Sequence, residues 1–164
     1  MPSPGMDMDT PTTMAEPLAL LRLLQLASPA LPVGAFNFSQ GLEFAHGQGW
    51  VTSEQHVGEW IDGVAEHALA GVDLPLLLRL HAAWGADLPD QVRQYSSELV
   101  ASRESHELRA EERHMGQSLA KILVEYGIHA AKPWVRDANT SYAAMFALAA
   151  VSAHATAQDC LLAY

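Results

Sequence analysis

Apolar residues recur along the chain at spacings of three and four, which is the period of α-helices and not the alternation of β-strands. The first helix is expected over residues 17–27 and should be largely buried, because it is apolar around most of its circumference, at Leu20, Leu21, Leu23, Leu24 and Leu26. Further helices are expected over residues 37–49, 53–70, 73–84, 90–101, 102–126, 142–154 and 156–164. The pattern predicts an all-α fold, an irregular bundle of about seven to eight helices.

Turn and capping residues set the expected ends of these helices. Thr52 with Gln55 is typical of a capping box, and the helix that follows is expected to end at Gly71. Asp73 is expected to cap the next helix, with Pro75 in its first turn. The helix before Gly71 is expected to face the core through Val57, Trp60, Ile61, Val64 and Leu69.

The two ends of the chain differ in composition. Residues 1–16 are rich in Pro, Thr, Asp and Met, so we expect a disordered N-terminal tail. Residues 17–164 are expected to form a single helical domain. Within it, residues 128–141 are predicted to be a loop, and Thr156 with Asp159 is predicted to form a capping box.

Charge and cysteine content narrow the classes of partner. The formal net charge is −10 with the eight histidines neutral, and nucleic-acid binding requires a basic surface, so nucleic acid is not an expected partner. No stretch approaches the roughly 18 uninterrupted apolar residues of a membrane span, so membrane insertion is not expected. The single cysteine, Cys160, can form no internal disulfide, which fits a reducing compartment and predicts a cytoplasmic protein.

The titratable residues form no compact catalytic or metal-binding motif. The closest histidines, His106 and His114, are eight residues apart, whereas ligands on one helix face stand three or four apart. Neither a metal site nor a cofactor is therefore expected, and only a site assembled across helices or across a dimer stays open. Cys160 lies in an apolar helix and is expected to be a core residue, not a nucleophile. His106 and Glu107 fit a solvated helix face better than an acid–base pair.

Two stretches leave a structural and a functional interpretation open. The sequence "SPALPVGAFNFSQGLE", residues 28–43, cannot be one regular helix because of its prolines and glycines. It is either a buried loop with Phe36 and Phe38 in the core or a rigid corner that docks another protein. The sequence "RESHELRAEER", residues 103–113, is either a solvated helix face or a docking surface of fixed Arg and Glu side chains.

Four segments in order resemble the UreF family of urease accessory proteins. They are "LLQLASPALPVGAFNFSQGLEFA" followed by "GWV", then "VDLPLLLRLHAA", "SRESHELRAEERHMGQSLAKIL" and "FALAAVSAHATAQDCLLAY". The resemblance covers residues 18–164. It implies an all-α, non-enzymatic protein that acts as a urease maturation chaperone and forms a homodimer.

The same resemblance implies the partners. A UreF-like protein binds UreD, also called UreH, and the GTPase UreG, and the assembly delivers nickel to apo-urease. An alternative is a regulator that activates or gates GTP hydrolysis by UreG, with Arg103 or Arg109 as an arginine finger or with Glu43 ordering a partner loop. The resemblance places the partner-binding residues at Pro32, Gly34, Phe36, Ser39, Gln40, Glu43, Arg103, Glu104, Glu107 and Arg109.

The sequence departs from the family pattern at its end. Members of the family continue past the position of "LLAY" with helical sequence that includes a Lys-Leu-x-Pro-Leu-Gly-Gln-like stretch, and nothing here matches it. We therefore expect a C-terminally shortened member with apolar surface exposed where that part would pack. A third alternative follows, which is a truncated fragment without activity.

Overall fold

The structure is a computed structural model that describes residues 17–26, 28, 33 and 41–164. The expected N-terminal tail and the two phenylalanines Phe36 and Phe38 lie outside the described residues. The described part contains eight α-helices, a π-helix and a 3-10 helix and no strand, which confirms the predicted all-α fold. The elements in chain order are α1 (Pro17–Leu26), α2 (Leu42–Gly47), α3 (Glu54–Gly63), π-helix η2 (Val64–Asp73), α4 (Leu74–Gly85), α5 (Pro89–Ser102), α6 (His106–Glu125), 3-10 helix η3 (His129–Val135), α7 (Tyr142–Ser152) and α8 (Ala157–Ala163).

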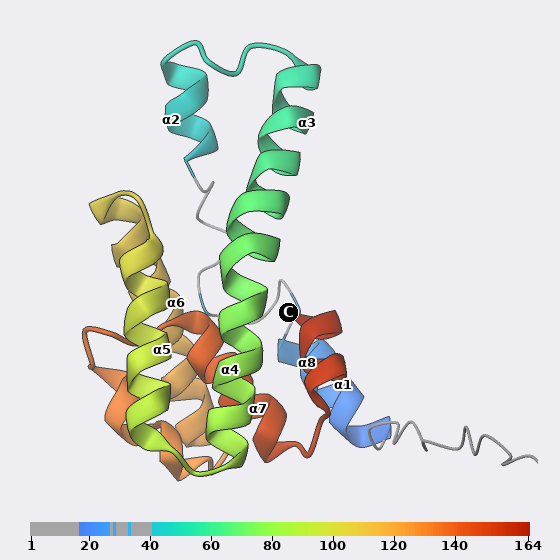
Figure 1. Cartoon of the computed structure of the whole chain (residues 1–164), viewed down its shortest axis with the longest axis vertical. Coiled ribbons are helices and arrows are strands. Elements are labelled where there is room, and N and C mark those ends of the chain that lie inside the picture. The colour runs from blue at the N-terminus through green and yellow to red at the C-terminus, as the bar shows by residue number, and fades with distance from the viewer. Residues whose placement is uncertain (1–16, 27, 29–32, 34–40) are drawn as a thin grey trace, which may run out of the picture.

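Helix α7 is the centre of the bundle. All eight residues from 143 to 150 are buried, as expected of a helix that is apolar around its whole circumference. Helices α4 and α6 pack against it most extensively, and α1, α5 and α8 also contact it (Figure 1). The largest fully buried side chains of this core include Leu23, Leu77, Leu80, Leu99, Leu119, Leu123, Met145 and Phe146.

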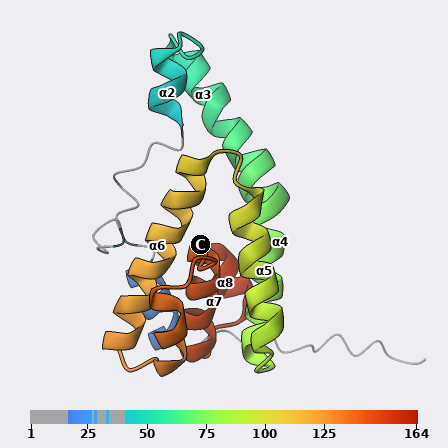
Figure 2. The ribbon, with the colours of Figure 1, turned by 90° about the vertical axis from the view of Figure 1, so that its left-hand side faces the viewer.

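Elements α3, η2 and α4 run on without a break as one long helix (Figures 1 and 2). The prediction that Gly71 ends a helix is wrong, because a glycine ends a helix by taking a left-handed conformation and Gly71 has no positive φ. The prediction that Asp73 caps a helix is also wrong. Asp73 has right-handed helical angles (φ −66°, ψ −49°), so the amides after it belong to the continuing helix.

The first part of this long helix projects away from the bundle together with α2 (Figures 1 and 2). We call residues 41–70 the arm; it comprises α2, α3 and most of η2. The prediction that residues of this helix face the core is wrong, since none of the residues of α3 is buried. Ile61 is 56% exposed and Leu69 in η2 is 37% exposed, because the bundle does not extend as far as this part of the helix.

Three local predictions have different outcomes. The capping box at Thr156 and Asp159 is confirmed at the start of α8. The box predicted at Thr52 is wrong by one residue, since Ser53 is the N-cap and its hydroxyl accepts the amide of His56 at 3.2 Å. Part of the predicted loop at 128–141 is the 3-10 helix η3, which buries the indole of Trp134.

Among the described helices, none has the length and apolar character needed to cross a lipid bilayer.

Candidate functional site

The structure describes five of the ten residues predicted to bind partners. Pro32, Gly34, Phe36, Ser39 and Gln40 lie outside the described residues. The other five fall into two regions: Glu43 lies on the arm, and Arg103, Glu104, Glu107 and Arg109 lie where α5 passes into α6.

Arg103 occupies a largely buried ion-pair site between three elements. Its Nη1 and Nη2 donate to the two carboxylate oxygens of Asp73 at 2.8 and 2.9 Å. Nη2 and Nε donate to Oε2 of Glu112 at 2.7 and 3.1 Å. The three side chains are only 16%, 11% and 4% exposed, so these are charge-assisted bonds with little competition from water. Arg103 thereby joins the end of η2 to α6.

The surrounding contacts extend this site into the core. The other carboxylate oxygen of Glu112 accepts the amide of Tyr142 at 2.7 Å, at the start of α7. Arg109 donates from Nη1 to the carbonyl of Arg103 at 2.6 Å. Burial by itself would lower the pKa of Arg103, but the hydrogen bonds and charges of Asp73 and Glu112 outweigh it and raise that pKa. The guanidinium is therefore a fixed cation that holds the fold.

Glu104 and Glu107 lie on the outside of this junction. Both are exposed. Ser105 caps α6 by accepting the amide of Leu108 at 3.1 Å, and the backbone amide of Glu107 and the Ser105 hydroxyl lower the pKa of Glu107. The stretch 103–113 thus combines ion pairs that hold the fold, at Arg103 and Glu112, with exposed carboxylates at Glu104 and Glu107, and a docking role for the exposed residues stays a prediction.

Sequence reasoning missed the partners of Arg103. Asp73 was interpreted as a helix cap, and Glu112 was interpreted as one member of a charged surface run. A usable signal was present for Glu112, which follows Leu108 by four residues and precedes Leu119 by seven, so it shares the buried face of α6.

Gly116 permits the close approach of α6 to the start of α7. A Cβ at this position would lie 2.7 Å from the carbonyl carbon of Ser141 and 2.9 Å from the carbonyl oxygen of Thr140, both backbone atoms that cannot turn away. Only glycine fits this contact, which sets the distance between two helices of the Arg103 site.

The arm presents a different kind of surface. Phe44 and Trp50 are 62% and 63% exposed and meet edge to face, with ring centroids 5.6 Å apart. Glu43 lies next to Phe44 in α2 and is also exposed. The arm carries no Lys or Arg, and its five carboxylates are exposed, at Glu43, Glu54, Glu59, Asp62 and Glu66.

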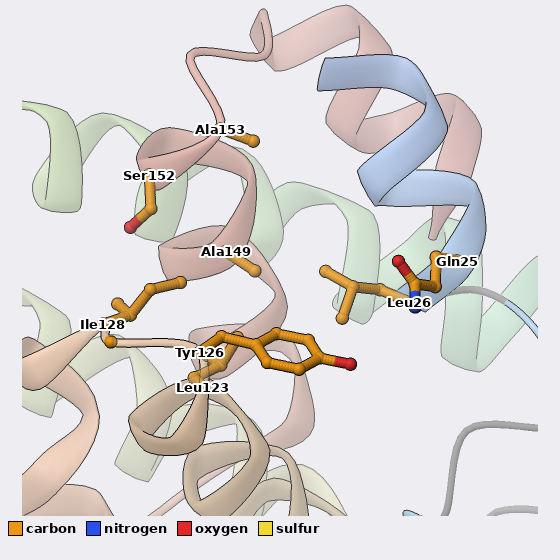
Figure 3. Close-up of a pocket in the computed structure, with 9 residues that line it drawn as sticks. Gln25, Leu26, Leu123, Tyr126, Ile128, Ala149, Ser152 and Ala153 are labelled. Carbon is orange, nitrogen blue, oxygen red and sulfur yellow. The ribbon is translucent and has the colours of Figure 1, made fainter. Parts of the chain in front are cut away.

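A groove of about 450 Å³ lies between α1, α7 and the C-terminal end of α6 (Figure 3). Its lining is uncharged and includes Gln25, Leu26, Tyr126, Ile128 and Ser152. The groove therefore contains no nucleophile activated by a base and no carboxylate pair for acid–base chemistry. It suits the burial of an apolar side chain more than a reaction.

The remaining reactive groups are dispersed. Burial raises the pKa of the Cys160 thiol to about 12, so it stays protonated and unreactive near neutral pH. Within residues 17–26, 28, 33 and 41–164, no three His, Cys, Asp or Glu side chains come together in a way that could hold a metal ion.

Comparison with known proteins identifies the family to which the chain is similar. The UreF family model matches residues 51–164, which is more than half of the chain. The urease accessory protein UreF of Alkalilimnicola ehrlichii is 47% identical over 132 residues, covering 80% of this chain and 58% of that protein.

Two further relatives agree with this match. UreF of Hahella chejuensis is 45% identical over 73% of this chain and 54% of its own length, and UreF of Chromohalobacter salexigens is 38% identical over 94% and 66%. The chain thus spans between half and two thirds of the length of these curated relatives. On this similarity the chain belongs to the UreF family.

Proposed function

We propose that this chain acts in urease maturation as a non-enzymatic chaperone in the cytoplasm, forming a homodimer that binds UreD (UreH) and UreG. Through that complex it would help deliver nickel to apo-urease, with the metal as cargo and not as a resident cofactor. The observation that carries the proposal is its similarity to relatives named urease accessory protein UreF, at 38% to 47% identity. The uncharged groove and the exposed arm agree with a role in binding.

The contacts of Arg103 favour a scaffold over an arginine finger. A finger must reach into the active site of a partner, whereas breaking the bonds from Arg103 to Asp73 and Glu112 would leave two buried carboxylates without their cation. Arg109 is engaged by the carbonyl of Arg103. GTP turnover by UreG with and without the chain distinguishes the two functions, since a finger would accelerate it and a scaffold would not.

Complementation tests the proposal directly. The chain is expressed in a bacterial host that carries a urease operon without its own UreF gene, and urease activity and urease-bound nickel are measured. The full-length relative from Alkalilimnicola ehrlichii is the positive control. Activity above the empty-vector level supports the proposal. If the relative restores urease and this chain does not, the chain does not perform the function on its own.

Binding to the accessory proteins gives a second readout. Size-exclusion chromatography with light scattering measures the mass of the chain alone, then with UreD, then with UreD and UreG. A dimer that forms the larger complexes supports the scaffold. A chain that binds neither protein contradicts it.

A further inference from the structure

The arm exposes apolar surface that the described part of the chain leaves uncovered. Phe44 and Trp50 leave more than half of their surface in water, and Ile61 is 56% exposed on the neighbouring helix. Trp60 in α3 lies close to the start of α2, since its Cζ2 would lie 3.5 Å from a Cβ on Gly41. Removing exposed aromatic surface from water favours association, and aromatic side chains are common anchors at protein interfaces.

The charge on the arm has a single sign. Its five carboxylates are exposed and no Lys or Arg lies anywhere between residues 41 and 70. Glu59, Asp62 and Glu66 follow each other at spacings of three and four, which brings like charges close on one side of the helix. Like charges at this spacing destabilise an isolated helix, and a cationic surface placed beside them removes that repulsion.

The exposed aromatic rings and the negative charge of the arm together restrict the kinds of molecule that can bind to it. Nucleic acid and anionic lipid are themselves negative and would be repelled by the five carboxylates. A second copy of this chain carries a net charge of −10 and is a poor electrostatic match for the arm. A basic protein surface meets both requirements, because it can neutralise the carboxylates and offer an apolar recess to the two rings.

We propose that the arm is the docking element for a protein partner whose basic surface surrounds an apolar recess. Phe44 and Trp50 enter the recess, and Glu59, Asp62 and Glu66 pair with the basic rim. The proposal rests on the proposed function only in expecting this partner among the urease accessory proteins. The physical basis, an exposed aromatic pair on an acidic projection, is independent of that function.

The test compares variants of the arm with matched variants of the bundle. The arm variants are the double substitution Phe44→Ala with Trp50→Ala and the double substitution Glu59→Lys with Asp62→Lys. The apolar control is Leu162→Ala, at a residue 78% exposed on α8. The charge control is Asp90→Lys with Glu98→Lys, both exposed on α5. Circular dichroism and denaturant unfolding select variants that keep the wild-type fold.

Purified UreD and UreG, used separately, are the first probes. We expect both arm variants to raise the Kd for one of them by about tenfold or more, the size of effect that defines an interface hot spot, while both controls stay within about twofold. The wild-type Kd should also rise with salt, and the Lys variant should lose that dependence. Arm variants that bind like the wild type and still mature urease would overturn the inference and leave the proposed function standing.

A peptide probe separates the inference from the proposed function. The probe is a labelled peptide of alternating Lys and Leu, and a Glu–Leu peptide of the same length is its counterpart. If neither accessory protein binds the wild-type chain, the proposed function fails, and the peptide then decides about the arm. Binding of the Lys–Leu peptide that both arm variants lose supports the inference. No binding, equal binding by the variants, or arm variants that convert a dimer into a monomer would overturn it.

Discussion

Two tryptophans show how differently the bundle and the arm use the same side chain. Trp134 in η3 is 3% exposed, meets Trp84 edge to face with centroids 5.9 Å apart, and lies under the guanidinium of Arg93. Trp50 on the arm is 63% exposed and meets the ring of Phe44 edge to face. The bundle therefore buries its aromatic surface internally, whereas the arm leaves aromatic surface exposed.

Polar groups differ between the two regions in the same way. In the described part, every buried side-chain nitrogen or oxygen has a hydrogen-bond partner. Ser96, for example, donates to the carbonyl of Asn139 at 2.6 Å and accepts the amide of Ser141 at 2.9 Å. The carboxylates of the arm are exposed, and one of them, Glu59, accepts a hydrogen bond from Gln55 at 2.8 Å. The bundle encloses its polar groups, whereas the arm keeps its charges at the surface.

The largest expected effect is the difference between the two tryptophan substitutions. Trp134→Ala should lower the free energy of unfolding by about 3–5 kcal/mol, because it leaves a cavity in the core. Trp50→Ala should cost no more than about 1 kcal/mol, since the indole is 63% exposed and its edge-to-face contact with Phe44 is worth about that much. Denaturant unfolding of the two variants measures both values. Equal losses would mean that the arm is as tightly packed as the bundle.

Breaking the Arg103 site should have the next largest effect. Arg103→Ala is expected to cost about 3 kcal/mol, because Asp73 and Glu112 then lose their cation in a largely buried place. The control is Arg93→Ala, which breaks a more exposed pair with Asp137, at 51% and 24% exposure, and the contact with the Trp134 ring, and should cost about 1–2 kcal/mol. Urea unfolding at low and high salt measures both. A loss for Arg103→Ala as small as the control would contradict a structural role.

The helical spacing of apolar residues predicted much of the buried core of the bundle, because the apolar face of a bundle helix packs against its neighbours. It placed Leu119 on an apolar face and Cys160 in the core, and both are buried. The same rule failed on the arm at Ile61 and Leu69, and the prediction that the first helix is largely buried is wrong at Leu21 and Leu24, which are 63% and 53% exposed on α1. An apolar stripe shows that a face favours burial, but it does not show whether the covering surface belongs to the same chain.

The candidate site was predictable only in part for a related reason. The charged stretch at Arg103 stands out in the sequence, but its partner Asp73 is 30 residues away, and local patterns carry no information about pairing at that distance. Glu112 could have been recognised from its place on the buried face of α6. Five residues that the resemblance singled out lie outside the described residues and remain predictions: Pro32, Gly34, Phe36, Ser39 and Gln40.

Alanine substitutions at two glycines, one in the bundle and one in the arm, should change the free energy of unfolding by smaller amounts and in opposite directions. Gly116→Ala should destabilise the protein by about 1–3 kcal/mol, since its Cβ would lie 2.7 Å from a backbone atom of Ser141. Gly58→Ala in α3 should stabilise it by roughly 0.5–1 kcal/mol, because no atom lies within 4 Å of the new Cβ and alanine favours a helix. Thermal unfolding gives both signs. Destabilisation by Gly58→Ala would show that the arm is packed against something at this site.

The smallest expected effect is a pH dependence that belongs to the bundle. Burial raises the pKa of Cys160 from 9.0 to about 12, so the folded state holds the thiol proton more tightly than the unfolded state does. This contribution to stability is fully present below about pH 9 and is lost progressively as the pH rises toward about 12. Cys160→Ala should therefore lose less stability than the wild type between about pH 8 and about pH 10.5, measured by urea unfolding.

Trp50→Ala is the matched control for this pH dependence, because it changes the arm and leaves the buried thiol in place. Its stability should fall over that range as steeply as that of the wild type. Some slope should also persist in Cys160→Ala, since burial and the charge of Glu112 raise the pKa of Tyr142 to about 12 as well. If Cys160→Ala and the wild type lose stability in parallel, the thiol does not titrate differently in the two states. If Trp50→Ala flattens the profile instead, the arm and the bundle are coupled, and the division between them fails.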